Sequence, residues 1–234
     1  MKALLLSAGF GKRLGSITKI QPKCLVKVKG TPILEIWIEK LAQLNIEEIF
    51  INTHYLSEQV ENFLKRYNNQ NIKITLLREN ELLGTAVTLH KNIDLYCNSD
   101  LLLAHTDNYF EEDLKNLIDS HKKRNAKCDL TMMTFDTDNP SSCGLVEVDN
   151  NNVVNRYIEK PKYSNLTKAN CAIFILSQNF LKNYSIYKNE KDFCKDIIPK
   201  FINKIYTHHT NKTFVDIGTP KSLELINDNY KNFK

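Results

Sequence analysis

Short apolar runs alternate with polar loops in the first half of the chain, and their spacing predicts strands that alternate with helices. The run over 3–6 stops at a Ser-Ala-Gly turn, as expected for a strand buried on both faces of a parallel sheet. After Pro32, apolar residues recur at helical spacing over 33–44, which predicts a helix with this proline in its first turn. Further strands are predicted over 47–52, 72–77 and 100–105, and further helices over 57–67, with a cap, and 84–91. This order predicts an α/β fold with a doubly wound, mostly parallel, Rossmann-like sheet.

The pattern changes from residue 128 onward to short strand-like segments joined by turns rich in Asn and Asp. Strands are predicted over 130–135, 145–148, 153–158 and 172–176, which together indicate a small β-rich insert. Helices over 177–182 and 192–203, strands over 204–207 and 212–215, and a helix from 220 to about 230 complete the prediction. We expect a single domain over 1–234, with halves at 1–127 and 128–234.

Composition bounds the class of protein but not its chemistry. The 234 residues, 42% hydrophobic and 25% charged, are ordinary for a globular α/β domain. The net charge of +5 is spread along the chain, so nucleic-acid binding is not indicated. No apolar run reaches the length of a membrane span, and the first strand is too short for a signal-peptide core. We therefore expect a cytoplasmic protein that binds neither nucleic acid nor membrane.

The six cysteines show no pattern of metal binding. There is no Cys-x-x-Cys pair and no histidine at a matching spacing, so zinc is not expected. Cys128 and Cys171 lie in apolar, strand-like segments, where cysteine behaves as a small buried hydrophobe. Such usage is typical of a reducing compartment.

The first predicted strand runs directly into a loop with two glycines and nearby cations. Gly9 and Gly11 lack a Cβ, so the backbone can adopt unusual dihedral angles and bring its N–H groups against a phosphate chain. Arg13 offers a planar fork and Lys23 a mobile point charge for phosphate oxygens. The spacing matches neither the dinucleotide-binding fingerprint nor a P-loop. On residue types alone, a phosphate site and a plain turn with solvated basic residues both stay open.

A longer block resembles the signature of bacterial sugar-1-phosphate nucleotidyltransferases. It comprises Gly9-Phe10-Gly11-Lys12-Arg13, Pro22-Lys23-Cys24-Leu25 and Val28-Lys29-Gly30-Thr31-Pro32. Cys24 stands where the family usually has proline, and Gly15-Ser16 replaces a common Arg-Pro, but neither change removes a charge. Matches continue in family order at 83–86, 105–107, 143–147, 159–161, 170–174 and 214–220, so the resemblance covers almost the whole chain.

The resemblance implies the nucleotidyltransferase (GT-A-like) fold, with nucleotide bound by residues 1–127 and sugar phosphate by residues 128–234. The implied substrates are a nucleoside triphosphate and a sugar 1-phosphate, which give a nucleotide sugar and pyrophosphate by Mg²⁺-assisted in-line attack on the α-phosphorus. GTP is favoured, because the chain looks most similar to guanylyltransferases for mannose or heptose 1-phosphate. Such a reaction depends on positioning and charge neutralisation more than on acid–base chemistry. An oligomer is compatible with the sequence.

The resemblance also assigns roles to individual residues. Arg13 and Lys23 are the implied catalytic residues, Arg13 on the β- and γ-phosphates and Lys23 near the reacting centre. Asp107 and Asp216 match the pair that holds Mg²⁺, an ion that prefers oxygen ligands and few protein contacts. The implied nucleotide-binding residues are Leu6, Ala8, Gly9, Gly11, Glu79, Gly84 and Thr85. The implied sugar-phosphate-binding residues are Gly144, Glu159, Lys160 and Asn170.

Several of these residues have a purely structural alternative. Asp107 fits a helix N-cap before 110–112, and Asp216 fits a turn before a helix that begins at a proline. Glu159-Lys160 also fits a solvated surface pair. Glu79 or Glu81 would accept hydrogen bonds from guanine, although exposed loop glutamates are the simpler interpretation.

The alternatives for the whole protein are a nucleotidyltransferase that uses UTP, dTTP or CTP and a non-catalytic, nucleotide-sugar-binding regulatory protein. An oxidoreductase that binds a dinucleotide is disfavoured, because the glycine fingerprint and its ribose-binding acid are missing. His105 has no assigned role, and His208-His209 is expected on a surface strand.

Overall fold

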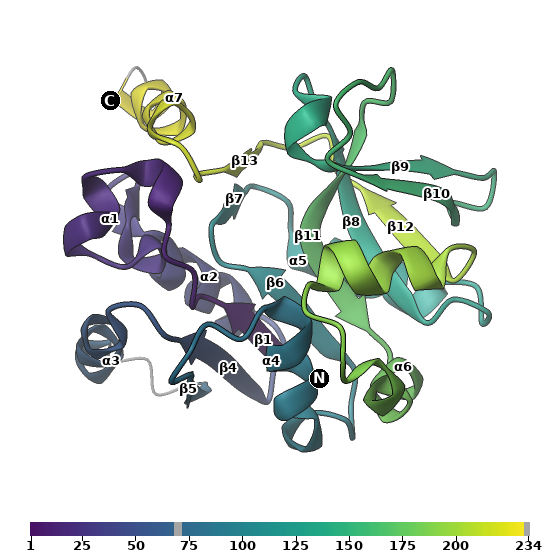
Figure 1. The fold of residues 1–234 in the computed structure, drawn as a ribbon, viewed down its shortest axis with the longest axis horizontal. Helices are drawn as coiled ribbons and strands as arrows, with labels where there is room; N and C mark the ends of the chain where they lie inside the picture. The colour runs from purple at the N-terminus through teal and green to yellow at the C-terminus, as the bar shows by residue number, and fades with distance from the viewer. Residues whose placement is uncertain (68–71, 232–234) are drawn as a thin grey trace. The chain divides into compact units, whose positions relative to one another are not determined.

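A computed structural model describes residues 1–67 and 72–231, and packing divides the chain into two compact units (Figure 1). The first unit comprises 1–82, 104–111 and 213–234, and the second comprises 83–103 and 112–212. The compact units do not follow the boundary at 127/128, and the division of functions between the two sequence halves stays a prediction.

The first unit contains a parallel sheet made from the apolar runs of the sequence. The strands are β1 (Lys2–Leu6), β4 (Glu48–Thr53), β5 (Lys73–Arg78) and the last residues of β6 (Leu101–His105). β1 pairs in parallel with β4, and β4 pairs in parallel with β5. β1 and β4 are almost wholly buried because both of their faces are covered. The predicted α/β class with a mostly parallel sheet is confirmed here.

The other elements of the first unit are short, apart from three helices. They are η1 (Lys12–Leu14), α1 (Ile17–Ile20), η2 (Lys23–Leu25), β2 (Lys27–Val28), β3 (Thr31–Pro32), α2 (Ile33–Ala42), α3 (Ser57–Arg66), β7 (Asn108–Phe110), β13 (Phe214–Asp216) and α7 (Pro220–Lys231). Pro32 lies in β3 directly before α2, and not in the first turn of the helix as predicted. The predicted cap of α3 is also wrong, because Leu56 precedes the helix in a left-handed conformation and no side chain caps it.

The second unit is rich in antiparallel strands, as the change of pattern predicts. Its strands are β8 (Leu130–Asp136), β9 (Gly144–Val148), β10 (Val154–Glu159), β11 (Lys168–Leu176) and β12 (Ile205–His209). The pairs β10–β9, β11–β9 and β11–β8 are antiparallel, whereas β12 runs parallel to β8. β11 begins four residues before the predicted strand. A bulge at Ala172, with φ of 52°, interrupts its regular register, and the predicted strand covers only the part from this bulge onward.

The helical segments of the second unit are mostly short. They are α4 (Thr85–Lys91), η3 (Ile93–Leu95), α5 (Leu114–Lys123), η4 (Pro140–Ser142), α6 (Gln178–Lys182), η5 (Tyr184–Tyr187), η6 (Phe193–Ile197) and η7 (Ile198–Phe201). The single helix predicted over 192–203 is therefore a π turn followed by a 3-10 turn. Pro199 explains the break, because it has no N–H to donate to a continuous helix.

Burial confirms some expectations and corrects another. Cys128 and Cys171 are buried, as their apolar contexts predict. His208 and His209, expected on a surface strand, are instead half-buried at the end of β12, where His208 Nδ1 lies 2.8 Å from Ser120 Oγ. Within the described ranges 1–67 and 72–231, no helix is long and apolar enough to cross a membrane.

Candidate active site

The loop after β1 is shaped by Gly11. This residue has a φ of 64°, and a Cβ built on it would lie 2.8 Å from Thr18 Cγ2 and 3.2 Å from Lys23 Cβ. The Thr18 hydroxyl also donates a hydrogen bond of 2.9 Å to the Gly11 carbonyl. No larger residue fits position 11 without displacing the loop. Gly11 thus uses the conformational freedom predicted for it, whereas Gly9 is not among the glycines with positive φ and a Cβ on it would meet open space.

Buried hydrogen bonds hold the start of this loop against the ends of its neighbouring strands. The Ser7 N–H donates to Asn52 Oδ1 at 2.6 Å, and the Ser7 hydroxyl donates to Thr106 Oγ1 at 3.1 Å. Thr106 donates in turn to the Leu6 carbonyl at 3.0 Å. Leu6 and Ala8, both predicted to bind nucleotide, are buried at this position. The loop therefore starts from a fixed base.

Glu79 belongs to the same buried network, so its interpretation as an exposed loop residue is wrong. Its carboxylate accepts a 2.8 Å hydrogen bond from Asn52 Nδ2, and its N–H donates to the Thr53 carbonyl. This bond continues the β4–β5 pairing and keeps the residue inside. Glu81, in contrast, is exposed as expected.

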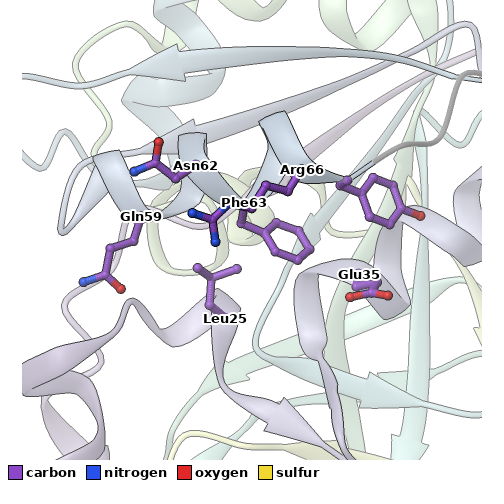
Figure 2. A pocket seen from close by; sticks show the side chains of 7 residues that line it. Leu25, Glu35, Gln59, Asn62, Phe63 and Arg66 are labelled. Atoms are coloured by element: carbon purple, nitrogen blue, oxygen red, sulfur yellow. The ribbon is translucent and has the colours of Figure 1, made fainter.

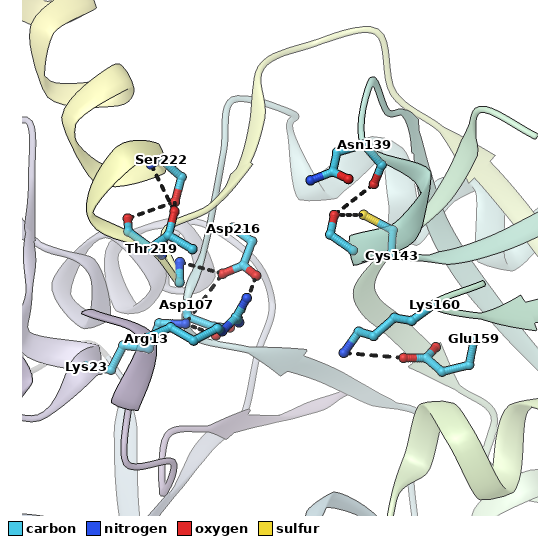
Figure 3. Close-up of polar contacts among 12 residues, drawn as sticks. Arg13, Lys23, Asp107, Asn139, Cys143, Glu159, Lys160, Asp216, Thr219 and Ser222 are labelled. Atoms are coloured by element: carbon cyan, nitrogen blue, oxygen red, sulfur yellow. Dashed lines mark hydrogen bonds and ion pairs between the residues drawn. The ribbon is translucent and has the colours of Figure 1, made fainter. Parts of the chain in front are cut away.

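Four charged side chains meet in the first unit (Figure 3). Lys23 Nζ pairs closely with Asp107 Oδ2 and lies 3.4 Å from Asp216 Oδ1. Arg13 Nη2 lies 3.4 Å from Asp216 Oδ2. Lys23 is the most enclosed, with 11% of its side chain exposed, whereas Arg13 is 63% exposed. We call Arg13, Lys23, Asp107 and Asp216 the charged cluster.

Strand pairing brings the two aspartates of the charged cluster together. β13 pairs antiparallel with β7, which places Asp216 opposite Asn108, and the Ile217 N–H donates to the Asp107 carbonyl at 3.0 Å. Asp107 is therefore not a helix N-cap, and Asp113 is the residue that caps α5. Asp216 does form the predicted turn, because its Oδ1 accepts a 2.7 Å hydrogen bond from the Gly218 N–H.

Gly218 is a part of this site that the sequence did not indicate. A Cβ at this position would lie 2.6 Å from Arg13 Nη2 and 2.7 Å from Asp216 Oδ1. The missing side chain thus leaves room for the Arg13–Asp216 pair. A glycine two residues after a candidate ligand is a weak signal, because turns before helices commonly contain glycine for conformational reasons alone.

The electrostatics keep Asp107 ionised. Burial raises the pKa of its carboxyl group, but the Lys23 ammonium and the neighbouring His105 outweigh burial and lower the pKa below its ordinary value. His105, which had no assigned role, therefore contributes to the field at this carboxylate.

The charged cluster has the donor chemistry for a hard divalent cation. The Lys23 ammonium, itself a cation, lies between the oxygens of Asp107 and Asp216 and so stands in for a metal ion there. Two carboxylates suit Mg²⁺, which takes few protein ligands and completes its shell with water and phosphate oxygens. Among residues 1–67 and 72–231, no group of three or more His, Cys, Asp and Glu side chains is arranged to hold a metal ion.

Gly84 and Thr85, the remaining predicted nucleotide-binding residues, belong to the second unit. Gly84 has a φ of 97°, and a Cβ there would lie 2.6 Å from the Lys191 carbonyl. The Thr85 hydroxyl accepts a 2.7 Å hydrogen bond from the Phe193 N–H. The close approach that Gly84 permits in this structure is therefore that of the chain around Lys191.

The predicted sugar-phosphate residues of the second unit surround a tyrosine. The Tyr157 hydroxyl donates to Glu159 Oε2, and a Cβ on Gly144 would overlap this hydroxyl. Asn170 Nδ2 lies 3.5 Å from Cys194 Sγ, and burial raises the pKa values of Tyr157 and Cys194, which keeps both groups neutral. We call Gly144, Tyr157, Glu159, Asn170 and Cys194 the neutral-donor cluster. Tyr157 could have been found from its spacing, because it lies two residues before Glu159 on the same strand face.

Lys160 differs from the neutral-donor cluster in being solvent-exposed. Its side chain is 61% exposed, and its Nζ lies 3.5 Å from Glu159 Oε1 (Figure 3). The backbone has a φ of 43°, and its N–H donates to the Cys143 carbonyl at 3.1 Å. This geometry is compatible with either a phosphate-binding residue or a solvated pair.

A cavity of about 560 Å³ in the described chain is lined by none of the predicted site residues (Figure 2). Its lining residues are Leu25, Glu35, Gln59, Asn62, Phe63, Arg66 and Tyr67. Leu25 ends the short turn that begins with Lys23, but Lys23 itself does not line the cavity.

Comparisons with known proteins agree with the resemblance noted from the sequence. A family model described as "Nucleotidyl transferase" matches residues 2–232. Mannose-1-phosphate guanyltransferase 2 of Candida glabrata is 29% identical over 230 residues, which cover 95% of this chain and 63% of that protein. Probable mannose-1-phosphate guanylyltransferase 1 of Oryza sativa subsp. japonica is 31% identical over 228 residues, which cover 94% and 62%. The chain thus spans less than two thirds of the length of these curated relatives.

Solved structures confirm the predicted fold. The crystal structure of HddC from Yersinia pseudotuberculosis complexed with GMP-PN has a TM-score of 0.80 and 26% identity, and the match covers 100% of this chain and 99% of that one. A putative glucose-1-phosphate thymidylyltransferase from Bacillus anthracis has a TM-score of 0.85 and covers 100% and 96%. Its identity is 23%, so this second likeness concerns the fold alone.

Proposed function

Since this chain belongs to the nucleotidyl transferase family, we propose that it transfers a nucleotidyl group from a nucleoside triphosphate to a sugar 1-phosphate. The charged cluster is the observation that carries this proposal. It joins two cations suited to phosphate oxygens with two carboxylates suited to a metal ion, and all four lie in one compact unit. The products are a nucleotide sugar and pyrophosphate.

The proposed donor is GTP, and the proposed acceptor is mannose 1-phosphate. The curated relatives named above are mannose-1-phosphate guanylyltransferases, and a similar solved structure was determined with GMP-PN. Both observations favour guanine over uracil, thymine and cytosine. The names of the curated relatives also favour mannose 1-phosphate over the heptose 1-phosphate considered from the sequence.

The proposed chemistry is an in-line displacement. An oxygen of the sugar phosphate attacks the α-phosphorus, and the bond between that phosphorus and the bridging oxygen to the β-phosphate breaks, so pyrophosphate leaves with that oxygen. Both reactants are polyanions that repel each other, so catalysis requires alignment and charge neutralisation. Lys23 neutralises charge near the α-phosphorus, and Arg13 holds the β- and γ-phosphates as they leave.

Nucleotidyltransferases of this kind generally use a divalent metal ion, and we assign Mg²⁺ to Asp107 and Asp216. When bound, it polarises phosphate oxygens and neutralises their developing charge. Before the metal ion binds, Lys23 reduces repulsion between these two carboxylates, and the His105 neighbour helps keep Asp107 ionised. The backbone from Leu6 to Gly11, on its base of buried hydrogen bonds, presents N–H groups to the phosphate chain.

The second unit supplies the other proposed contacts. Glu159, Asn170 and the Gly144 backbone would bind sugar hydroxyls, and Lys160 would bind the sugar phosphate. Its exposed ammonium on a flexible stem suits this role. Gly84 and Thr85, at the start of α4, would contact the base and ribose. In the first unit, Glu79 would accept hydrogen bonds from guanine while it stays bonded to Asn52.

An activity matrix tests the proposal. GTP, UTP, dTTP, CTP and ATP are each combined with mannose 1-phosphate, glucose 1-phosphate and a heptose 1-phosphate in the presence of Mg²⁺. Pyrophosphate release and mass spectrometry of the nucleotide sugar are the readouts. We expect the highest rate with GTP and mannose 1-phosphate, and no release when either substrate is omitted.

Two results would contradict this function in different ways. A higher rate with another triphosphate would overturn the choice of base while leaving the reaction class intact. Binding of a nucleotide sugar without pyrophosphate release for any pair would favour the non-catalytic regulatory alternative. Asp107→Asn serves as the inactive control, because it removes the negative charge of a proposed metal ligand while changing the side-chain volume very little.

A further inference from the structure

The carboxylates proposed to hold the metal ion already have a cationic partner in this chain. Lys23 Nζ pairs with Asp107 Oδ2 and lies 3.4 Å from Asp216 Oδ1. Only 11% of the Lys23 side chain and 25% of the Asp107 side chain are exposed, so water screens the contact between these two groups weakly. Arg13 makes a further contact with Asp216 Oδ2, at 3.4 Å. The cations proposed for phosphate and the carboxylates proposed for metal therefore satisfy one another.

The formal charges of the charged cluster sum to zero, and this balance has a consequence for binding. A metal ion that enters alone must displace Lys23 from the oxygens of Asp107 and Asp216, and it then lies close to two cations, Lys23 and Arg13. A triphosphate that enters alone must take Lys23 and Arg13 from their carboxylates and comes close to two anions. When both enter together, the carboxylates turn to the metal ion and the cations turn to the phosphates, so every charge keeps a partner.

We propose that Lys23 competes with the divalent metal ion for Asp107 and Asp216, and that metal and triphosphate therefore bind with positive coupling. The competition itself stands on the charged cluster alone, and the identity of the phosphate ligand rests on the proposed function. Lys23 can make the exchange because its ammonium is a point charge on a flexible four-carbon stem. The coupling is reciprocal by linkage, so the metal ion tightens triphosphate binding by the same factor.

This exchange gives the site a way to reject incomplete substrates. A free metal ion or a metal-free nucleotide each meets an internally paired cluster, whereas the metal–nucleotide complex offers partners to both halves of it. Lys23 thus acts on specificity for the metal complex as well as on charge at the reacting centre.

The test is a titration with Mn²⁺ alone, with free Mn²⁺ measured by electron paramagnetic resonance and with no nucleotide or sugar phosphate present. Lys23→Met removes the ammonium and keeps an unbranched stem. Lys12→Met is the matched control. Lys12 lies in the same segment between β1 and β2, but its ammonium lies over the Phe10 ring, and no contact of it with Asp107 or Asp216 is found in the described chain. We expect Lys23→Met to bind Mn²⁺ at least about tenfold more tightly than the wild type and Lys12→Met to bind it within about twofold of the wild type.

Several outcomes would overturn the proposal. Equal or weaker Mn²⁺ binding by folded Lys23→Met would exclude competition, and equal tightening by Lys12→Met would indicate a general effect of charge. Tight binding that persists in Lys23→Met combined with Asp216→Asn would place the ion elsewhere. Lys23→Gln, with the same expected tightening, replaces Lys23→Met if circular dichroism shows that the methionine variant is unfolded.

The titration separates this inference from the proposed function. The titration contains no substrate, so its result holds even if no pair of substrates in the activity matrix reacts. If the wild type is active but Lys23→Met binds Mn²⁺ no more tightly, only the competition is refuted. Coupling is then measured as the affinity for GTP with and without Mg²⁺. We expect the ratio of these affinities to fall at least about fivefold in Lys23→Met, and an unchanged ratio would contradict the coupling.

Discussion

The two polar clusters of this protein are built on opposite principles. The charged cluster of the first unit pairs full charges, and its outer member Arg13 is largely exposed. The neutral-donor cluster of the second unit relies on a hydroxyl, an amide and a thiol, and it encloses a single carboxylate, Glu159. Gly144 closes this second cluster so tightly that a methyl group would overlap Tyr157.

The two clusters therefore discriminate between ligands in different ways. Charge pairs reach partners of the opposite sign over a range of geometries and can be exchanged for ligand contacts. Neutral hydrogen bonds and close packing act only over short distances, so they discriminate by shape. Substitutions in the charged cluster should therefore change turnover more than folding, and substitutions in the neutral-donor cluster should change both.

The largest expected effect is that of Lys23→Ala on turnover. We expect a folded protein whose kcat/KM is at least about a hundredfold lower, which corresponds to about 2.7 kcal/mol of lost transition-state stabilisation. The reason is that Lys23 is proposed to neutralise charge near the α-phosphorus. Steady-state kinetics with GTP and mannose 1-phosphate measure kcat/KM, and a thermal melt shows whether the variant is folded. Near-normal turnover would refute the role of Lys23.

Gly144→Ala should instead destabilise the protein. The added Cβ would overlap the Tyr157 hydroxyl and lie 2.7 Å from Glu159 Oε2, so these two hydrogen-bonded side chains must be displaced. Overpacking of this kind costs about 1–3 kcal/mol. Urea denaturation measures the loss, with Gly9→Ala as the control, because Gly9 has open space and no positive φ. If both variants are equally stable, the neutral-donor cluster is not closed by Gly144.

Gly218→Ala sharpens the comparison, because it crowds the charged cluster without entering a core. Its Cβ would lie 2.6 Å from Arg13 Nη2, and the flexible arginine would move away from Asp216. We expect kcat/KM to fall about tenfold, or about 1.4 kcal/mol. Gly218 is buried, but its added Cβ would meet the ends of the Arg13 and Asp216 side chains, which are 63% and 46% exposed and can move. The free energy of unfolding should therefore fall by less than in Gly144→Ala. Unchanged kinetics would show that the Arg13–Asp216 pair has no part in turnover.

The smallest expected effect is a difference in how pH acts on the two units. In the second unit, His121 is buried, with Nδ1 2.8 Å from Thr131 Oγ1 and Nε2 3.5 Å from Asp100 Oδ2. Burial lowers the pKa of His121 below its ordinary value of 6.5. In the first unit, Lys23 and His105 outweigh burial and lower the pKa of Asp107 below 3.8.

Both effects lower stability as pH falls, but they appear in different pH ranges. As pH falls through 6.5, the unfolded chain binds a proton at His121 and the folded chain does not, so stability declines by at most about 1.4 kcal/mol per pH unit. The stability contributed by Asp107 is present above pH 3.8 and is lost only below it. Denaturant melts between pH 8 and 5 should show the decline in the wild type. His121→Gln should reduce the decline to the part that other groups contribute, among them His208, whose pKa burial also lowers. An equal decline in His121→Gln would assign the effect to another group.

Much of the fold follows from local patterns in the sequence. The runs at 3–6 and 100–105 predict β1 and β6 because a strand buried on both faces needs nothing but apolar side chains. The position of Asp107 directly after such a strand is equally local information. The break between η6 and η7 was also foreseeable, because Pro199 cannot donate within a helix.

The partners of the site residues were not predictable in this way. Glu79 is buried because Asn52, on another strand, donates to its carboxylate, and no periodicity of the sequence encodes that pairing. The same holds for Asn170 and Cys194, which meet only through the fold of the second unit. Resemblance to a family located the charged residues, whereas the groups that position them appear only in three dimensions.

The most direct test of the central claim is a crystal structure with Mn²⁺ and a non-hydrolysable GTP analogue, with the metal located from its anomalous signal. The account predicts an anomalous peak between Asp107 and Asp216, with Lys23 and Arg13 on the triphosphate and the phosphates against the loop at Gly11. A triphosphate bound elsewhere, or a metal ion with neither carboxylate as a ligand, would contradict it.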